Sequence, residues 1–121
     1  MGKPFALIVE DDIELSDIFA VVLQASGMET EIVRDGSLAL PRISATSPDV
    51  VVLDMHLPNV SGMEILSQLR ADPVLRTTRV VVITADALLA RASEGQADLA
   101  LIKPVSFSQI SDLTSRLVQT T

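Results

Sequence analysis

Short runs of apolar residues alternate along the chain with longer segments in which apolar residues recur at helical spacing. Residues 5–9 are a continuous apolar run, residues 49–53 and 79–83 are apolar after one charged residue, and residues 28–33 and 98–102 are more weakly apolar. Strands of a parallel sheet are buried on both faces and carry such unbroken runs. The pattern therefore predicts three central strands and two strands at the edges of a sheet.

The segments between and after these runs have the spacing of amphipathic helices. They are residues 13–25, 36–45, 61–71 and 86–94, followed by a last helix that begins at Ser106. Gly27 lies just past the first helix, where glycine commonly ends one. Pro41 lies inside the second and predicts that it is shortened or kinked, because proline lacks a backbone N–H. Gln109 stands three residues after Ser106, which predicts a capping box.

The same spacing predicts which side chains the helices bury. The first helix presents Leu15, Ile18, Phe19, Val22 and Leu23 on one face, the third Ile65, Leu66 and Leu69, and the last Phe107, Ile110, Leu113 and Leu117. Residues 87–90 are expected to lie mostly in the core, and Met55 and Met63 are expected to pack there.

Regular alternation of strands and helices predicts an α/β fold, with a doubly wound parallel sheet and right-handed crossovers. Placing the three most apolar strands in the centre gives the strand order 2-1-3-4-5, the flavodoxin-like (βα)5 arrangement of five strands. The sequence has no internal repeat or linker, so residues 1–121 are expected to form a single domain.

Composition narrows the classes of function. The chain has no cysteine, which excludes disulfides and thiolate metal sites, and a cytoplasmic location is the simplest interpretation. The net charge of −7 and the absence of Trp and Tyr argue against binding to nucleic acid or an anionic membrane. No apolar run approaches the ~20 residues that a membrane span requires. A metal cation or a basic protein surface is the expected partner.

The strand ends carry the candidate chemistry. Ligands of such sheets bind beyond the carboxyl ends of the strands, where this sequence places Glu10, Asp11, Asp54, Thr84 and Lys103. Three carboxyl groups so close together would repel one another unless a cation neutralised them, and oxygen ligands favour Mg²⁺. Asp54 could then be a nucleophile that forms an aspartyl-phosphate, with Lys103 stabilising the charge and Thr84 donating a hydrogen bond. The neighbouring Asp12 is more simply a helix cap.

Four motifs strengthen this hypothesis, because they occur in a fixed order and at fixed spacings. They are "LIVEDD" (7–12), "VVLDMHLPNVSG" (51–62), "VVVITA" (80–85) and "LIKPV" (101–105). Together they resemble the response regulator receiver domain of two-component signalling, including the chemotaxis regulators. The resemblance extends over about residues 4 to 119.

The resemblance implies a role for each matching residue. Asp54 corresponds to the phosphorylated aspartate, Thr84 to the switch hydroxyl and Lys103 to the lysine that pairs with the phosphoryl group. Asp11 would bind Mg²⁺ directly and Glu10 through water. The metal site would also include Asp54 and the backbone carbonyl of His56, the side chains of His56 and Asp86 would limit access of water, and the Lys103–Pro104 bond would be cis.

The resemblance also implies partners. A histidine kinase or phosphotransfer protein would phosphorylate Asp54, and the phosphorylated form would bind a downstream protein, with homodimerisation left open. The chain would phosphorylate and dephosphorylate itself rather than act as an enzyme on a separate substrate. Two positions depart from the family pattern. Ala100 stands where many members have an aromatic residue, and Gln96 stands where many have glycine.

Other interpretations remain open at this stage. The chain could be a receiver-like binding module that does not use phosphorylation, or a receiver taken from a larger regulator or hybrid kinase. A flavin carrier with the same strand order is disfavoured, because the acidic loop after the first strand would repel a phosphate and no Trp or Tyr is available to stack on the ring.

Overall fold

The computed structural model describes residues 2–119, apart from the side chains of residues 114, 115 and 117–119. The strands are β1 (Phe5–Val9), β2 (Glu29–Val33), β3 (Val50–Asp54), β4 (Arg79–Thr84) and β5 (Leu99–Ile102). The helices are α1 (Ile13–Ala25), α2 (Gly36–Thr46), α3 (Gly62–Ala71), α4 (Ala87–Ala92) and α5 (Phe107–Gln119). Every predicted strand and helix is therefore present.

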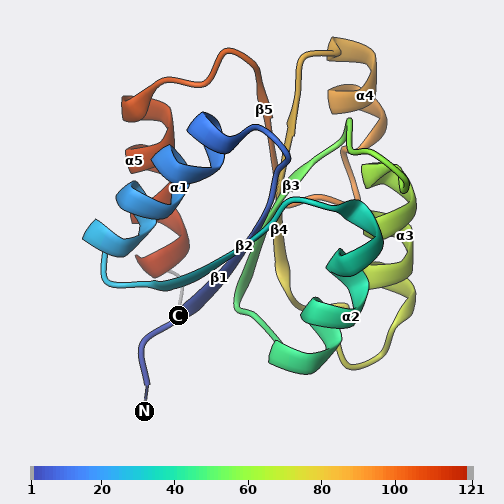
Figure 1. The fold of residues 1–121 in the computed structure, drawn as a ribbon, viewed down its shortest axis with the longest axis horizontal. Coiled ribbons are helices and arrows are strands. Elements are labelled where there is room, and N and C mark those ends of the chain that lie inside the picture. The colour runs from blue at the N-terminus through green and yellow to red at the C-terminus, as the bar shows by residue number, and fades with distance from the viewer. Residues whose placement is uncertain (1, 120–121) are drawn as a thin grey trace.

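The five strands form one parallel sheet in the order β2-β1-β3-β4-β5, which confirms the predicted topology. Helices α1 and α5 cover one face of this sheet, and α2, α3 and α4 cover the other (Figure 1). No helix in residues 2–119 is both long enough and apolar enough to span a membrane.

Alternation along the strands divides the buried residues into two cores. In β1, Ala6 and Ile8 pack towards α1 and α5, whereas Leu7 and Val9 pack towards α2 and α3. The central strand β3 is buried along its whole length, ending with Asp54. Both faces of a central strand are covered, which explains why its sequence is continuously apolar up to that carboxyl group.

Local signals set the helix ends as expected. Asp12 caps α1 through a 2.9 Å hydrogen bond from Leu15 N, so the cap assigned to it is confirmed. Ser106 and Gln109 form the predicted capping box, with hydrogen bonds of 2.9 and 3.2 Å. Pro41 does not shorten α2, which continues to Thr46. Proline removes one backbone hydrogen bond, and burial of this helix's inward face outweighs that loss.

Two burial predictions are wrong. Phe107 is 61% exposed and Leu88 is 77% exposed. Phe107 is the first residue of α5, and Ile110 and Leu113 are the buried positions of that helix, as predicted. Helix α4 has only six residues and buries Ala90 alone, so residues 87–90 do not lie mostly in the core. The Leu117 side chain lies outside the described residues.

Arg70 near the end of α3 binds the segments that precede β4 and β5, at the amino-terminal ends of these strands. Its guanidinium group donates hydrogen bonds to the main-chain carbonyls of Gln96, Arg76 and Thr78, at 2.6, 2.9 and 2.6 Å. It also pairs with Asp98 at 3.0 Å, and the same Asp98 oxygen accepts a hydrogen bond from Val80 N. One side chain thus holds α3 against the segments that lead into β4 and β5.

Candidate functional site

The strand register brings the predicted residues together at the carboxyl ends of the strands. Leu53 pairs with Val9, so Asp54, the last residue of β3, and Glu10, the residue after β1, lie at the same level of neighbouring strands. Thr84 pairs with Ile102, and Lys103 N donates a 2.8 Å hydrogen bond to the Thr84 carbonyl. The carboxyl ends of four neighbouring strands therefore meet where the sequence predicted a site.

Three carboxyl groups lie together at this edge. One oxygen from each of Glu10, Asp11 and Asp54 falls within 4.8 Å of the others. Glu10 and Asp54 are almost fully buried, at 0% and 1% exposed, whereas Asp11 is open to solvent. Lys103 Nζ lies 3.1 Å from Glu10 Oε1 and 3.5 Å from Asp54 Oδ2. One ammonium group therefore lies beside both buried carboxyl groups.

Glu10 is in an environment that disfavours its charged form. Its Oε2 accepts a 3.1 Å hydrogen bond from Asp12 N, whereas its buried Oε1 has the Lys103 ammonium 3.1 Å away as an ion-pair partner. Burial, followed by the nearby Asp54 carboxyl group, raises the pKa of Glu10 to about 8. Burial alone would lower the pKa of Lys103, but Glu10 and Asp54 outweigh it and raise that pKa.

This set of donors fits a divalent cation. A buried carboxylate oxygen that makes no hydrogen bond, a second buried carboxylate and an exposed one supply hard oxygen ligands. Carboxylates that lie this close together are stabilised when a positive ion is bound between them. The acidic cluster can therefore hold a metal ion at the carboxyl ends of β1 and β3.

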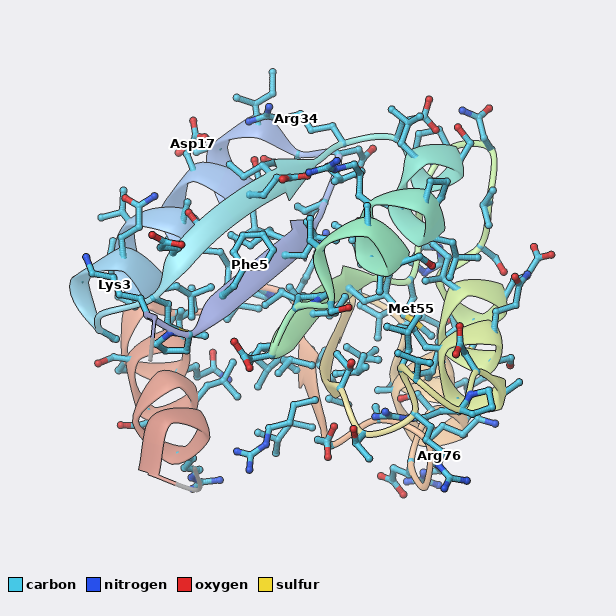
Figure 2. All side chains as sticks on the ribbon, turned by 90° about the horizontal axis from the view of Figure 1, so that it is seen from below. Lys3, Phe5, Asp17, Arg34, Met55 and Arg76 are labelled. Atoms are coloured by element: carbon cyan, nitrogen blue, oxygen red, sulfur yellow. The ribbon has the colours of Figure 1, made fainter. Side chains whose placement is uncertain are left out.

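Main-chain contacts orient the Asp54 carboxyl group. Its Oδ1 accepts a 3.1 Å hydrogen bond from His56 N, which leaves Oδ2 facing Lys103. The next residue, Met55, is buried and lies beside α3 in Figure 2. A Cβ atom on Gly62 would lie 2.6 Å from Met55 Cα and 2.7 Å from the Asp54 carbonyl. Only glycine therefore allows the first turn of α3 to approach this closely.

Thr84, His56 and Asp86 surround this centre. Thr84 is fully buried, and its hydroxyl oxygen accepts a 3.0 Å hydrogen bond from Asp86 N, so it is engaged by its own loop. The Asp86 carboxylate caps α4 through Leu88 N at 2.9 Å. The His56 side chain is exposed. The control of water access by His56 and Asp86 stays a prediction, whereas the cis Lys103–Pro104 bond is confirmed.

A pocket of about 460 Å³ opens beside Lys103, between α1 and the loop that leads into α5. Its lining residues are Asp12, Glu14, Leu15, Ile18, Lys103, Pro104 and Val105. Lys103 is the candidate site residue that lines this pocket.

Two residues that support the site were not predicted from the sequence. Gly62 ends the second motif but received no role, and a glycine directly after a serine helix cap was the available signal. Asn59 was also missed. It adopts a left-handed conformation with φ of 75°, which asparagine tolerates better than most residues, and its side chain bonds to Asp35.

Comparisons with known proteins agree with this geometry. A family model for the response regulator receiver domain matches residues 6–115. The polar-differentiation response regulator DivK of Brucella anthropi is 35% identical over 103 residues, covering 83% of this chain and 84% of DivK. The Mn²⁺-bound form of response regulator Rcp1 has a TM-score of 0.86 at 26% identity, over 98% of this chain and 96% of Rcp1.

A longer relative is similar over part of its length. The DNA-binding response regulator MtrA of Mycobacterium tuberculosis is 32% identical over 98 residues, covering 81% of this chain and 43% of MtrA. This chain thus spans less than half the length of the MtrA proteins that it matches. The family match covers most of the chain and includes every residue of the acidic cluster. The chain therefore belongs to the response regulator receiver domain family.

Proposed function

We propose that this chain is a phosphoacceptor, in which Asp54 receives a phosphoryl group from the phosphohistidine of a histidine kinase or phosphotransfer protein. The observation that carries the proposal is the position of Asp54. Its carboxyl group is buried, oriented by His56 N and 3.5 Å from the Lys103 ammonium. A carboxylate held beside a fixed cation is suited to attack an electrophilic phosphorus.

Mg²⁺ is the proposed ion for the acidic cluster. Asp11 and Asp54 would bind it directly, Glu10 through water, and the His56 carbonyl would complete the protein ligands. When bound, Mg²⁺ would offset the negative charge that gathers between the carboxylates and the incoming phosphoryl group. Its proposed ligands are all oxygen atoms, which Mg²⁺ prefers.

The chain's own residues would then perform the transfer. An Asp54 oxygen attacks phosphorus, the P–N bond to the donor histidine breaks, and its electron pair returns to the imidazole. Lys103 would shift from Glu10 towards the new phosphoryl oxygens on Asp54, because its ammonium already lies near both Glu10 and Asp54. The Thr84 hydroxyl would turn from Asp86 N to donate to a phosphoryl oxygen. Later hydrolysis of the acyl phosphate would return Asp54 to its free form.

The output would be a changed protein-binding surface. Movement of Thr84 alters the loop that begins α4, and this helix is held by few buried side chains. We propose a downstream protein as the target and residues 1–121 as a single receiver domain.

Incubation with acetyl phosphate and Mg²⁺, followed by intact-mass measurement, tests the reaction. The wild type should gain one phosphoryl group, and Asp54→Asn should gain none. Asp49→Asn is the matched control, since Asp49 precedes the same strand and its carboxylate accepts a hydrogen bond from Phe5 N. Equal labelling of Asp54→Asn and wild type would refute the assignment. A wild type that takes no phosphate but binds partners would support the alternative, a binding module that does not use phosphorylation.

A further inference from the structure

The loop between β3 and α3, residues 55–61, rests against the N-terminus of α2. Asn59 Nδ2 donates a 3.0 Å hydrogen bond to Asp35 Oδ1, the carboxylate that caps α2. This hydrogen bond, followed by those from the Ser37 main chain and hydroxyl, lowers the pKa of Asp35. Asp35 is therefore held as a charged acceptor that joins the loop to the helix.

Gly36 provides a second contact at the same place. A Cβ atom on Gly36 would lie 3.0 Å from the Val60 carbonyl oxygen and 3.2 Å from that of Pro58. Both neighbours are main-chain atoms, so they could move away only by displacing the loop. The loop backbone and the first turn of α2 are therefore in close contact.

The other end of the loop reaches the phosphoacceptor. His56 N donates the hydrogen bond to Asp54 Oδ1, and only two residues separate His56 from Asn59. Across Asn59, Val60 N donates a 2.9 Å hydrogen bond to the Pro58 carbonyl, which closes a tight turn. A short, tightly turned loop transmits a displacement at Asn59 to His56, because few rotatable bonds lie between them.

We propose that Asp35, Gly36 and Asn59 are positioning residues, which hold residues 55–61 so that His56 N keeps the Asp54 carboxyl group in its reactive orientation. The consequence for catalysis rests on the proposed phosphorylation of Asp54. The orientation itself can be measured without phosphate. The two readouts therefore separate this inference from the proposed function.

Asn59→Gly removes the side-chain hydrogen bond without adding strain, because glycine accepts the positive φ of residue 59. Ser47→Gly is the matched control. Ser47 also has a positive φ, of 47°, but lies at the far end of α2, away from the loop. The initial rate of phosphorylation by acetyl phosphate should fall about threefold to tenfold in Asn59→Gly. Ser47→Gly should keep the wild-type rate.

Gly36→Ala tests the close contact independently. Replacing glycine by alanine inside a helix normally stabilises it, so a purely local effect would leave the rate unchanged and raise stability. Displacement of the Pro58 and Val60 carbonyls should instead lower the phosphorylation rate by a similar factor. In the double variant with Asn59→Gly, the two effects should be less than multiplicative, because both act on the same loop.

The backbone amide resonance of His56, recorded by nuclear magnetic resonance on metal-free and unphosphorylated protein, is the structural readout. It should shift in Asn59→Gly and Gly36→Ala but not in Ser47→Gly. Unchanged His56 resonances in both loop variants, with circular dichroism showing folded protein, would overturn the positioning role. If the wild type accepts no phosphate, the proposed function fails, and the His56 resonance alone decides whether these residues position Asp54.

Discussion

The Lys103 ammonium lies closer to the buried Glu10 carboxylate, at 3.1 Å, than to Asp54, at 3.5 Å. The lysine is thus shared between Glu10, which would bind the metal through water, and Asp54, which would accept the phosphoryl group. Its removal leaves two buried carboxyl groups without a cation. We expect Lys103→Met to lose about 3 kcal/mol of unfolding free energy in metal-free buffer above pH 8, where Glu10 is charged, as for a broken buried ion pair. Urea unfolding measures this, and an unchanged midpoint would contradict the shared pairing.

The pH dependence of stability should report Glu10. Its pKa is about 8 in the folded protein against an ordinary value of 4.5, so the folded state binds this proton more tightly than the unfolded state. The resulting stability is fully present below pH 4.5 and is lost as the pH rises through about 8. Urea unfolding of metal-free wild type should therefore give a free energy that declines over this range, and Glu10→Gln should decline less. Parallel curves for the two proteins would refute the buried, raised pKa.

Magnesium should stabilise the folded chain. If the acidic cluster binds the ion, unfolding free energy rises by about 2.7 kcal/mol when free Mg²⁺ exceeds its dissociation constant a hundredfold. Thermal unfolding with Mg²⁺ and then with excess EDTA measures the gain and its reversal. Asp11→Asn should remove most of the gain. Asp12→Asn loses the same charge but keeps a good helix cap, so it should retain the gain, and an equal loss in both variants would indicate a non-specific charge effect.

Gly62→Ala should be destabilising although alanine favours helices. The added Cβ would lie 2.6 Å from Met55 Cα, so the main chain next to Asp54 must move. We expect a loss of about 1–3 kcal/mol, as for an overpacked site, together with slower phosphorylation. Ser67→Ala on the exposed face of the same helix is the control for helix propensity. If Gly62→Ala were as stable as the wild type, the packing of α3 against Met55 would not require glycine at residue 62.

Arg70 should be much more important to stability than an exposed arginine with comparable geometry. Arg70→Met loses hydrogen bonds to three carbonyls and to Asp98, which should cost roughly 2–4 kcal/mol in urea unfolding. Lysine should not restore it, because it lacks the planar fork of donors. The control is Arg42→Met, which breaks the surface pair with Glu31 at 2.7 Å and should have a far smaller effect. Similar losses in Arg70→Met and Arg42→Met would remove the special role of Arg70.

The continuous apolar runs were sufficient to predict the strands, their order and the meeting of Glu10, Asp54 and Lys103 at one edge. This succeeded because a strand buried on both faces has an unambiguous pattern, and parallel strands bring their carboxyl ends together. The amphipathic pattern was less informative for Leu88 and Phe107. It shows which face of a helix is apolar, but not how far along the helix the packing extends.

Contacts between distant segments could not be predicted from local patterns. Arg70 and Asp98 are 28 residues apart, and Asn59 and Asp35 are 24 apart. In both pairs the partners are brought together only by the packing of α2, α3 and the sheet. Likewise, the strand order predicted that Lys103 would lie near the acidic cluster, but not that it would lie nearest to Glu10.

The two edges of the sheet differ in how they would meet a further strand. The outer strand β2 carries Glu29 and Glu31, and charged side chains at an edge oppose strand addition. The other outer strand, β5, consists of Leu99, Ala100, Leu101 and Ile102 and carries no charge. Edge-to-edge aggregation at high concentration should therefore begin at β5, and a charged residue introduced there would be the most direct way to suppress it.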